Sequence, residues 1–174
     1  MPSLVVAVAA MLAATPARWT AIAALDAELL ARRPAPGEWS AIECLTHVVD
    51  GEARVFLARV HAIRDGRDIT AFDPDTEGSP VTSSMRELAA ELAILRGASL
   101  TALATLTEDD LERSVRHAEL GPVTLRELLN EWAAHDTMHL VQAERALIAA
   151  FIPGSGPWRS YFADHDIGRG VTGA

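Results

Sequence analysis

The sequence contains no lysine, a single cysteine and few aromatic residues: four Trp, four Phe and one Tyr. Its fifteen basic residues are all arginines, and 24 acidic residues give it a formal net charge of −9. A nucleic-acid-binding protein gathers cations against phosphates, and this acidic chain has no basic run, so we expect no nucleic-acid partner. The complete use of arginine in place of lysine is typical of a GC-rich genome and favours a bacterial origin.

The lone cysteine, Cys44, cannot form an internal disulfide, which fits a reducing cytoplasm. It lies within the apolar run "IECLTHVV", where a thiol normally packs as a small hydrophobic group. We therefore expect a cytoplasmic protein in which Cys44 is an inert core residue.

The first residues, "MPSLVVAVAAMLAAT", are apolar but have no Lys or Arg before the apolar run, which a secretory signal requires. The apolar run is also shorter than the roughly 20 residues of a membrane-spanning helix. We interpret this segment as an N-terminal helix that packs on the rest of the protein, and we expect no membrane association.

A length of 174 residues, 49% of them hydrophobic, suffices for one domain over residues 1–174 with a sizeable core. Because aromatic residues are scarce, Ala, Leu, Val and Ile must fill that core. Small aliphatic side chains of this kind favour closely packed helices.

Three capping boxes mark helix starts, each a Ser or Thr followed three residues later by Glu and then by an apolar run. They are Ser40 with Glu43, Ser84 with Glu87, and Thr124 with Glu127. Thr15-Pro16 offers a further cap and an N1 proline, so a helix is expected to start again or kink there.

The periodicity predicts four long helices, at about 3–25, 41–65, 83–105 and 125–150. The connection 66–82 is a long polar crossover, and 106–123 contains a turn that short extended pieces could flank. We therefore predict an all-α fold, a four-helix bundle with long crossover connections, in which functional sites lie between facing helices.

Two histidines, His135 and His139, are four residues apart on the last predicted helix, so their rings are neighbours on one face. That face is otherwise formed by apolar residues, and the whole stripe is Leu128, Trp132, His135, His139, Ala143 and Ala146. Two imidazoles placed in this way can bind one metal ion.

A third histidine, His47, lies on a stripe of mainly small residues on the second predicted helix: Cys44, His47, Gly51, Val55 and Ala58. Small neighbours let helices approach closely or leave space beside the ring. His47 could reach the depth of His135 if the two helices run in the same direction. A histidine on an apolar face also occurs as an ordinary hydrogen-bonded core residue, and the spacing alone leaves both interpretations open.

Three longer stretches resemble one known family: "RPAPGEWSAIECLTHVVDGE", "LGPVTLRELLNEWAAHDTMHLVQAERAL" and "GPWRSYF". They are similar to the Pro-Gly-Glu-Trp-Ser turn, the helix with one His, the later His-Asp-x-x-His helix and the final Gly-Pro-Trp element of the DinB-like (DinB/YfiT) superfamily. The similarity covers nearly the whole chain.

The resemblance implies a four-helix bundle with a divalent metal held by three histidines, at positions His47, His135 and His139 here. Imidazole ligands suit zinc or nickel best among the ions we consider, with iron also compatible. The metal should bind less well below about pH 6, because each imidazole must lose its proton to bind.

The resemblance also implies a function class and a homodimer. Some relatives are transferases or isomerases that use a low-molecular-weight thiol, so a metal-dependent thiol S-transferase with a small-molecule substrate is our leading hypothesis. A metal-dependent hydrolase, or a non-catalytic stress-response or binding protein with a structural or vestigial metal, are the alternatives. The apolar "LVVAVAAML" segment is a candidate contact for the homodimer.

Other polar and aromatic residues receive expectations as well. Asp50, Asp136 and Glu52 could orient the ligand histidines from behind, or act as ordinary structural acids. Trp39 and Trp158 should pack at the ends of the bundle, with Trp158-Arg159 closing the pocket. Surface roles are expected for His61, His117 and His165, and Cys44 is a competing fourth ligand.

Overall fold

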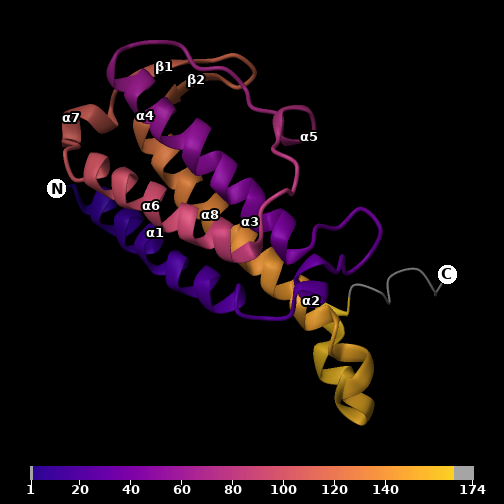
Figure 1. The fold of residues 1–174 in the computed structure, drawn as a ribbon. Coiled ribbons are helices and arrows are strands. Elements are labelled where there is room, and N and C mark those ends of the chain that lie inside the picture. The colour runs from indigo at the N-terminus through magenta and orange to yellow at the C-terminus, as the bar shows by residue number, and fades with distance from the viewer. Residues whose placement is uncertain (1, 167–174) are drawn as a thin grey trace.

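The computed structural model describes residues 2–166 and contains four long helical units arranged as a bundle (Figure 1). The second unit is a continuous rod of three segments, the middle one a π-helix, η1. The units are α1 (Ser3–Ile22), α3–η1–α4 (Ala41–Asp50, Gly51–Phe56 and Leu57–Arg64), α6 (Met85–Leu103) and α8 (Leu125–Ala149). The prediction of a helical four-helix bundle is confirmed.

Short elements connect these helices. Three are helices of one turn or slightly more: α2 (Ala27–Ala31), α5 (Pro74–Glu77) and α7 (Glu108–Leu111). Strands β1 (Ser114–His117) and β2 (Gly121–Thr124) form an antiparallel hairpin before α8, as the extended pieces expected there imply. The 3-10 segment η2 (Ile152–His165) follows α8.

Two apolar core clusters show how the helices run. The first contains Val5 and Val8 of α1, Leu103 of α6 and Leu125 and Leu129 of α8. The second joins the opposite ends of the same helices, with Trp19, Leu88 and Leu147 among its members. Helices α1 and α8 are therefore parallel to each other, and α3–η1–α4 and α6 run in the opposite direction. The crossover 65–84 returns the chain so that α6 can lie parallel to the second unit.

Each of α1 and α3 packs against both α6 and α8, so α1 lies diagonally across the bundle from α3. Helix α8 runs antiparallel to α3. From the sequence we considered the opposite case, in which the two helices run in the same direction and His47 and His135 lie at similar distances from their helix starts. His47 and His139 still meet, because the start of α3 lies beside the end of α8. His47 is in the second turn of α3, and His139 is roughly three turns before the end of α8.

Helix boundaries follow the sequence signals closely for three of the four units. Capping boxes precede α6 and α8, where the Glu87 and Glu127 amides donate to Ser84 and Thr124 and the carboxylates accept in return. Helix α4 ends at Arg64, just before Gly66, whose φ of 71° reverses the chain.

The expected break near Pro16 is wrong, because α1 continues through it as one helix of 20 residues. A buried stripe of α1, including Leu12 and Trp19, packs on both sides of the proline. Pro16 has no amide proton for the Leu12 carbonyl, and the Thr15 hydroxyl lies 3.3 Å from that oxygen instead. Tertiary packing thus outweighs the local signal.

The length of the continuous α1 and its mean hydropathy of 1.5 would allow it to cross a membrane. In the structure, however, its buried side chains belong to the bundle core, with Val5, Leu12 and Trp19 all at 0% exposure. The hydroxyl of Thr15, also on α1, donates a hydrogen bond to the carboxylate of Asp136 on α8 at 2.8 Å. The expectation that this segment packs on the domain is therefore confirmed.

A buried polar network joins all four helical units between the two apolar clusters. Arg96 of α6 is 1% exposed and donates to Asp136 of α8 at 2.5 Å, and it lies 3.3 Å from Glu52 of η1. Trp132 also donates to Glu52 at 3.2 Å, and Thr15 contributes from α1. Burial raises the pKa of Glu52, and the nearby Arg96 guanidinium opposes that shift.

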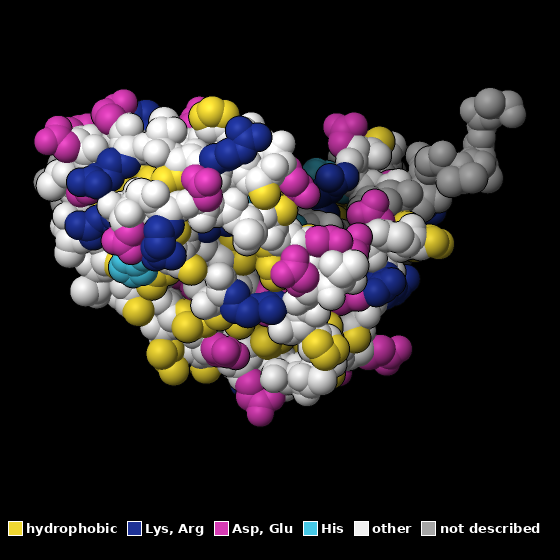
Figure 2. Space-filling model, turned by 90° about the horizontal axis from the view of Figure 1, so that it is seen from above, with side chains coloured by type: hydrophobic (Ala, Val, Ile, Leu, Met, Phe, Trp, Pro, Cys, Tyr) yellow, Lys and Arg dark blue, Asp and Glu magenta, His cyan; other side chains and the backbone are white. Residues whose placement is uncertain are grey.

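The outer surface is mixed in charge. Seen from above, arginine and acidic side chains alternate over the bundle, and hydrophobic side chains gather along one edge (Figure 2). On this face the cations do not form one continuous basic patch.

Candidate metal centre

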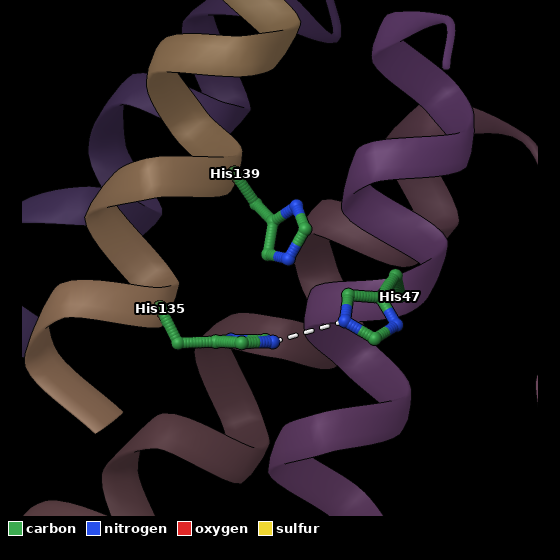
Figure 3. Close-up of side chains that lie close together, drawn as sticks. All are labelled: His47, His135 and His139. Carbon is green, nitrogen blue, oxygen red and sulfur yellow. Dashed lines mark hydrogen bonds between the residues drawn. The ribbon is translucent and has the colours of Figure 1, made fainter. Parts of the chain in front are cut away.

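Three histidines meet between α3 and α8. The rings of His135 and His139 extend from successive turns of α8 toward His47 on α3 (Figure 3). The Nε2 atoms of His47 and His135 are 2.9 Å apart, and one potential ligand nitrogen from each residue lies within 4.8 Å of the others. Within residues 2–166 this is the one group of three or more His, Cys, Asp or Glu side chains with such spacing.

Aromatic side chains enclose the histidine cluster. The Trp39 indole stacks on His139, with ring centroids 5.5 Å apart, and meets His47 edge-on at 5.1 Å. Phe56 lies edge-on to His135 at 5.2 Å. Trp39 was expected to pack at a bundle end, and it does pack, but against the histidines themselves.

Gly51 makes the close approach of the helices possible. A Cβ atom there would lie 3.1 Å from the Phe56 ring and 3.8 Å from Cε1 of His135. The small-residue stripe of the second helix therefore lets the two helices approach closely, as proposed from the sequence, and at Gly51 it leaves room for the ring of His135. The π-helical segment that begins at Gly51 was not predicted.

Burial keeps the three imidazoles neutral. It lowers the pKa of His47 to about 4 and that of His135 to about 3, and neighbouring histidines add to both shifts. Burial also lowers the pKa of His139, although hydrogen bonding to Gln142 and the charge of Asp136 oppose it. All three pKa values are therefore shifted in the direction that favours the neutral imidazole, the form that binds a metal ion.

Gln142 is a site residue that the sequence analysis missed. Its Oε1 lies 2.9 Å from Nδ1 of His139, and because a carbonyl oxygen only accepts, Nδ1 carries the proton. The Nε2 atom of His139 is then unprotonated and available as a ligand. The signal was present in the sequence, since residues three apart on a helix are neighbours.

The acids behind the site do not hydrogen-bond to the histidines. Asp50 accepts from the amide and hydroxyl of Ser79, both at 2.7 Å, and pairs with Arg54 at 2.8 Å, so it fixes the crossover. Asp136 and Glu52 belong to the Arg96 network. These three acids therefore act as structural residues and do not orient the ligand histidines.

The remaining expectations have mixed outcomes. Trp158 is 63% exposed and Arg159 pairs with Asp166 at 2.7 Å, so the prediction that they pack and close the pocket is wrong. His61 and His165 are exposed as expected. His117 is instead 6% exposed, and its Nδ1 accepts from the amides of the hairpin turn.

Cys44 is fully buried and lies in the second core cluster, outside the group of potential ligands. Burial raises the pKa of its thiol to about 12. The expectation of an inert core thiol is confirmed, and the structure offers no support for Cys44 as a fourth ligand.

Three cavities border the histidines. One of about 300 Å³ is lined by His47 together with Trp39 and Asp50, and the other two differ in character. The larger, about 890 Å³, borders His139 and Trp39 and has mainly apolar walls that include Met11, Met138 and Val141. A smaller cavity of about 230 Å³ borders His47 and His135 on another side, and its walls include Phe72, Arg59 and Glu131. The cluster is thus accessible from more than one direction.

Comparison with known proteins agrees with this architecture. The sequence profile described as the DinB superfamily matches residues 11–143, about three quarters of the chain. The chain belongs to the DinB superfamily. A comparison with curated protein sequences gives no significant match.

A solved structure shares the DinB bundle. It is described as "YfiT from Bacillus subtilis is a probable metal-dependent hydrolase with an unusual four-helix bundle topology". The TM-score is 0.72 at 18% sequence identity, over 82% of this chain and 85% of that chain. At this identity the similarity establishes the fold, and any activity has to be argued from the site.

The donor set of this DinB-superfamily chain fits a divalent cation. Three neutral imidazoles suit zinc, nickel and iron, and they leave further coordination positions open. The carboxylates of Asp50 and Asp136 are engaged elsewhere, so no acidic ligand shifts the preference toward calcium or magnesium. The three histidines could therefore hold a metal ion.

Proposed function

We propose that the protein is a metal-dependent enzyme, most specifically a thiol S-transferase, in which His47, His135 and His139 hold a zinc or nickel ion. The observation that supports this proposal is the placement of more than one cavity against a single histidine cluster. A transferase must bring two molecules together at one centre, whereas a hydrolase needs room for one organic substrate and a water molecule.

His47, His135 and His139 would hold the ion, which would supply a Lewis acid that lowers the pKa of a thiol or water molecule. The protein contributes neutral ligands, with Gln142 fixing the orientation of His139. Trp39 and Phe56 limit the access of water around the rings. In the proposed transfer the thiol would release its proton to solvent, its sulfur would form a bond to an electrophilic carbon, and the leaving group would depart with the electron pair of the broken bond.

The thiol has to come from outside the protein. Cys44 is fully buried in the core, and its raised pKa keeps it protonated at neutral pH. We therefore propose a low-molecular-weight thiol as cosubstrate, and a reducing cytoplasm as the compartment where such a thiol is available. We also propose that the protein acts as a homodimer.

A metal-dependent hydrolase is the second candidate, favoured by Glu131. This residue lines the same cavity as His47 and His135 and lies one helical turn before His135. A carboxylate there could serve as the general base that takes a proton from a water molecule. The third candidate, a non-catalytic protein with a structural metal, predicts a closed site and is less consistent with the cavities that border the histidines.

The test begins with metal analysis of the purified protein, followed by reconstitution with zinc or nickel. Reconstituted protein is incubated with a small thiol and an electrophilic aryl halide, and separately with an activated ester, and products are identified by mass spectrometry. A thioether product, lost in His135→Ala and kept in Cys44→Ser, supports the transferase. Ester cleavage without thioether formation supports the hydrolase, and neither product supports the non-catalytic alternative.

A further inference from the structure

The smaller cavity beside the histidines adjoins a second one. The first borders His47 and His135, and the second, about 370 Å³, borders Arg54 and Arg67. Their walls share Val55, Arg59 and Phe72. Arg59 therefore lies where the two cavities meet, in the wall of the same cavity that borders His47 and His135.

Arg59 differs from the other two arginines in its partners. Arg54 pairs with Asp50 at 2.8 Å, and Arg67 pairs with Asp65 at 2.9 Å. In the described part of the chain, Arg59 has no carboxylate within ion-pair distance, and its one hydrogen bond goes from Nη2 to the Thr70 carbonyl at 2.8 Å. A guanidinium has five N–H donors, so most of its donors have no protein acceptor.

Arg59 lies in surroundings where an unpaired cation is unfavourable. Its side chain is partly buried, and this burial lowers its pKa. Glu131 interacts with it electrostatically from the wall of the same cavity, but the two do not form a direct ion pair. In a chain with 24 acidic residues, a partly buried arginine without a direct acidic partner is a ready binding site for an anion.

We infer that Arg59 binds the carboxylate of a small thiol whose sulfur lies at the histidine cluster, with the carbon chain between Val55 and Phe72. This inference rests on the proposed function and adds the substrate class: the thiol is anionic. Arg59 then orients the molecule by a charge-assisted hydrogen bond, and the apolar walls contact its methylene groups.

Binding is measured by isothermal titration calorimetry on zinc-loaded protein with two probes, 3-mercaptopropionate and the neutral 2-mercaptoethanol. We expect the anionic thiol to bind more tightly, and Arg59→Gln to weaken it by roughly 10- to 100-fold without affecting the neutral one. Arg126→Gln, which changes a partly exposed arginine that pairs with Glu112 and lines neither cavity, is the matched control and should change neither affinity. Arg59→Lys, which keeps the charge, should recover part of the affinity, and thermal melts establish that each variant is folded.

A second readout separates this inference from the proposed function. Propionate, which has no thiol, is titrated into ¹⁵N-labelled metal-free protein while the arginine Nε–Hε signals are followed by NMR. A shift of the Arg59 signal without thiol turnover would support the anion site and contradict the transferase. Equal affinities for the two thiols, unchanged in Arg59→Gln, would overturn the anion site even if turnover is observed.

Discussion

The Nε2 atoms of His47 and His135 lie 2.9 Å apart, although 88 residues separate them in the chain. At that distance the two nitrogens share one proton, because two unprotonated nitrogens would repel each other. A bound cation would replace this proton between them. The contact joins α3 to α8 and places the candidate metal centre at the interface of two antiparallel helices.

The first prediction concerns metal affinity. His135→Ala should abolish stoichiometric zinc or nickel binding, because only two of the three ligand histidines would remain. Gln142→Ala should lower the affinity by about 10- to 100-fold, since His139 loses the acceptor that fixes its Nδ1 proton. Competition with a chromophoric chelator measures both. Unchanged affinity in His135→Ala would show that the ion, if present, binds elsewhere.

The second prediction concerns pH. Burial holds the pKa of His47 at about 4 and that of His135 at about 3 in the folded protein, against about 6.5 in an unfolded chain. Between these values the unfolded chain binds more protons, so the free energy of unfolding of the metal-free protein should fall as pH decreases from about 6.5 to 4. Urea titrations at pH 7.5, 6 and 5 measure it. The slope should be smaller in His135→Gln and unaltered by replacement of the exposed His61.

The third prediction concerns the buried network around Arg96. Arg96→Met leaves Asp136 and Glu52 without their cation inside the bundle, and we expect a loss of about 3–5 kcal/mol in the free energy of unfolding. Arg86→Met on the exposed side of the same helix is the matched control and should change it by less than about 0.5 kcal/mol. Comparable losses in the two variants would contradict a specific role for the network.

The fourth prediction concerns Cys44. Its complete burial and a thiol pKa of about 12 should protect it from an aromatic disulfide reagent in the folded protein, with reaction only after denaturation. Cys44→Ser should still bind zinc. Rapid reaction of the native thiol would show that the core around Cys44 opens, and loss of zinc in the variant would restore Cys44 as a ligand.

The fifth prediction is a homodimer. Val6 and Met11 of α1 are 49% and 46% exposed, and Met138 and Val141 of α8 are 54% and 49% exposed, so the parallel helices present apolar surface to solvent. Light scattering at micromolar concentration should return twice the chain mass. Val6→Glu should shift the measured mass toward that of the monomer. Glu91→Gln, a substitution at an exposed position of α6, should leave the mass unchanged.

The sequence predicted most of the helix boundaries because the signals are local. Capping boxes at Ser84 and Thr124 fix the starts of α6 and α8 through hydrogen bonds between residues three apart. Gly66, in a conformation with positive φ, ends α4 one residue from where the sequence indicated. The spacing of four identified His135 and His139, and the family resemblance added His47. Both signals depend on which residue types occur at which sequence positions, so neither needs the tertiary structure.

Tertiary structure alone decided the rest, because those features depend on contacts between distant segments. Packing on both sides of Pro16 keeps α1 continuous through a residue that locally favours a break, and Thr15 binds Asp136 of α8 instead of capping a helix. The same network uses Asp136 and Glu52 to hold Arg96, not to orient histidines. The antiparallel course of α3 and α8 sets His47 against His135, and only their burial together lowers the pKa of both rings.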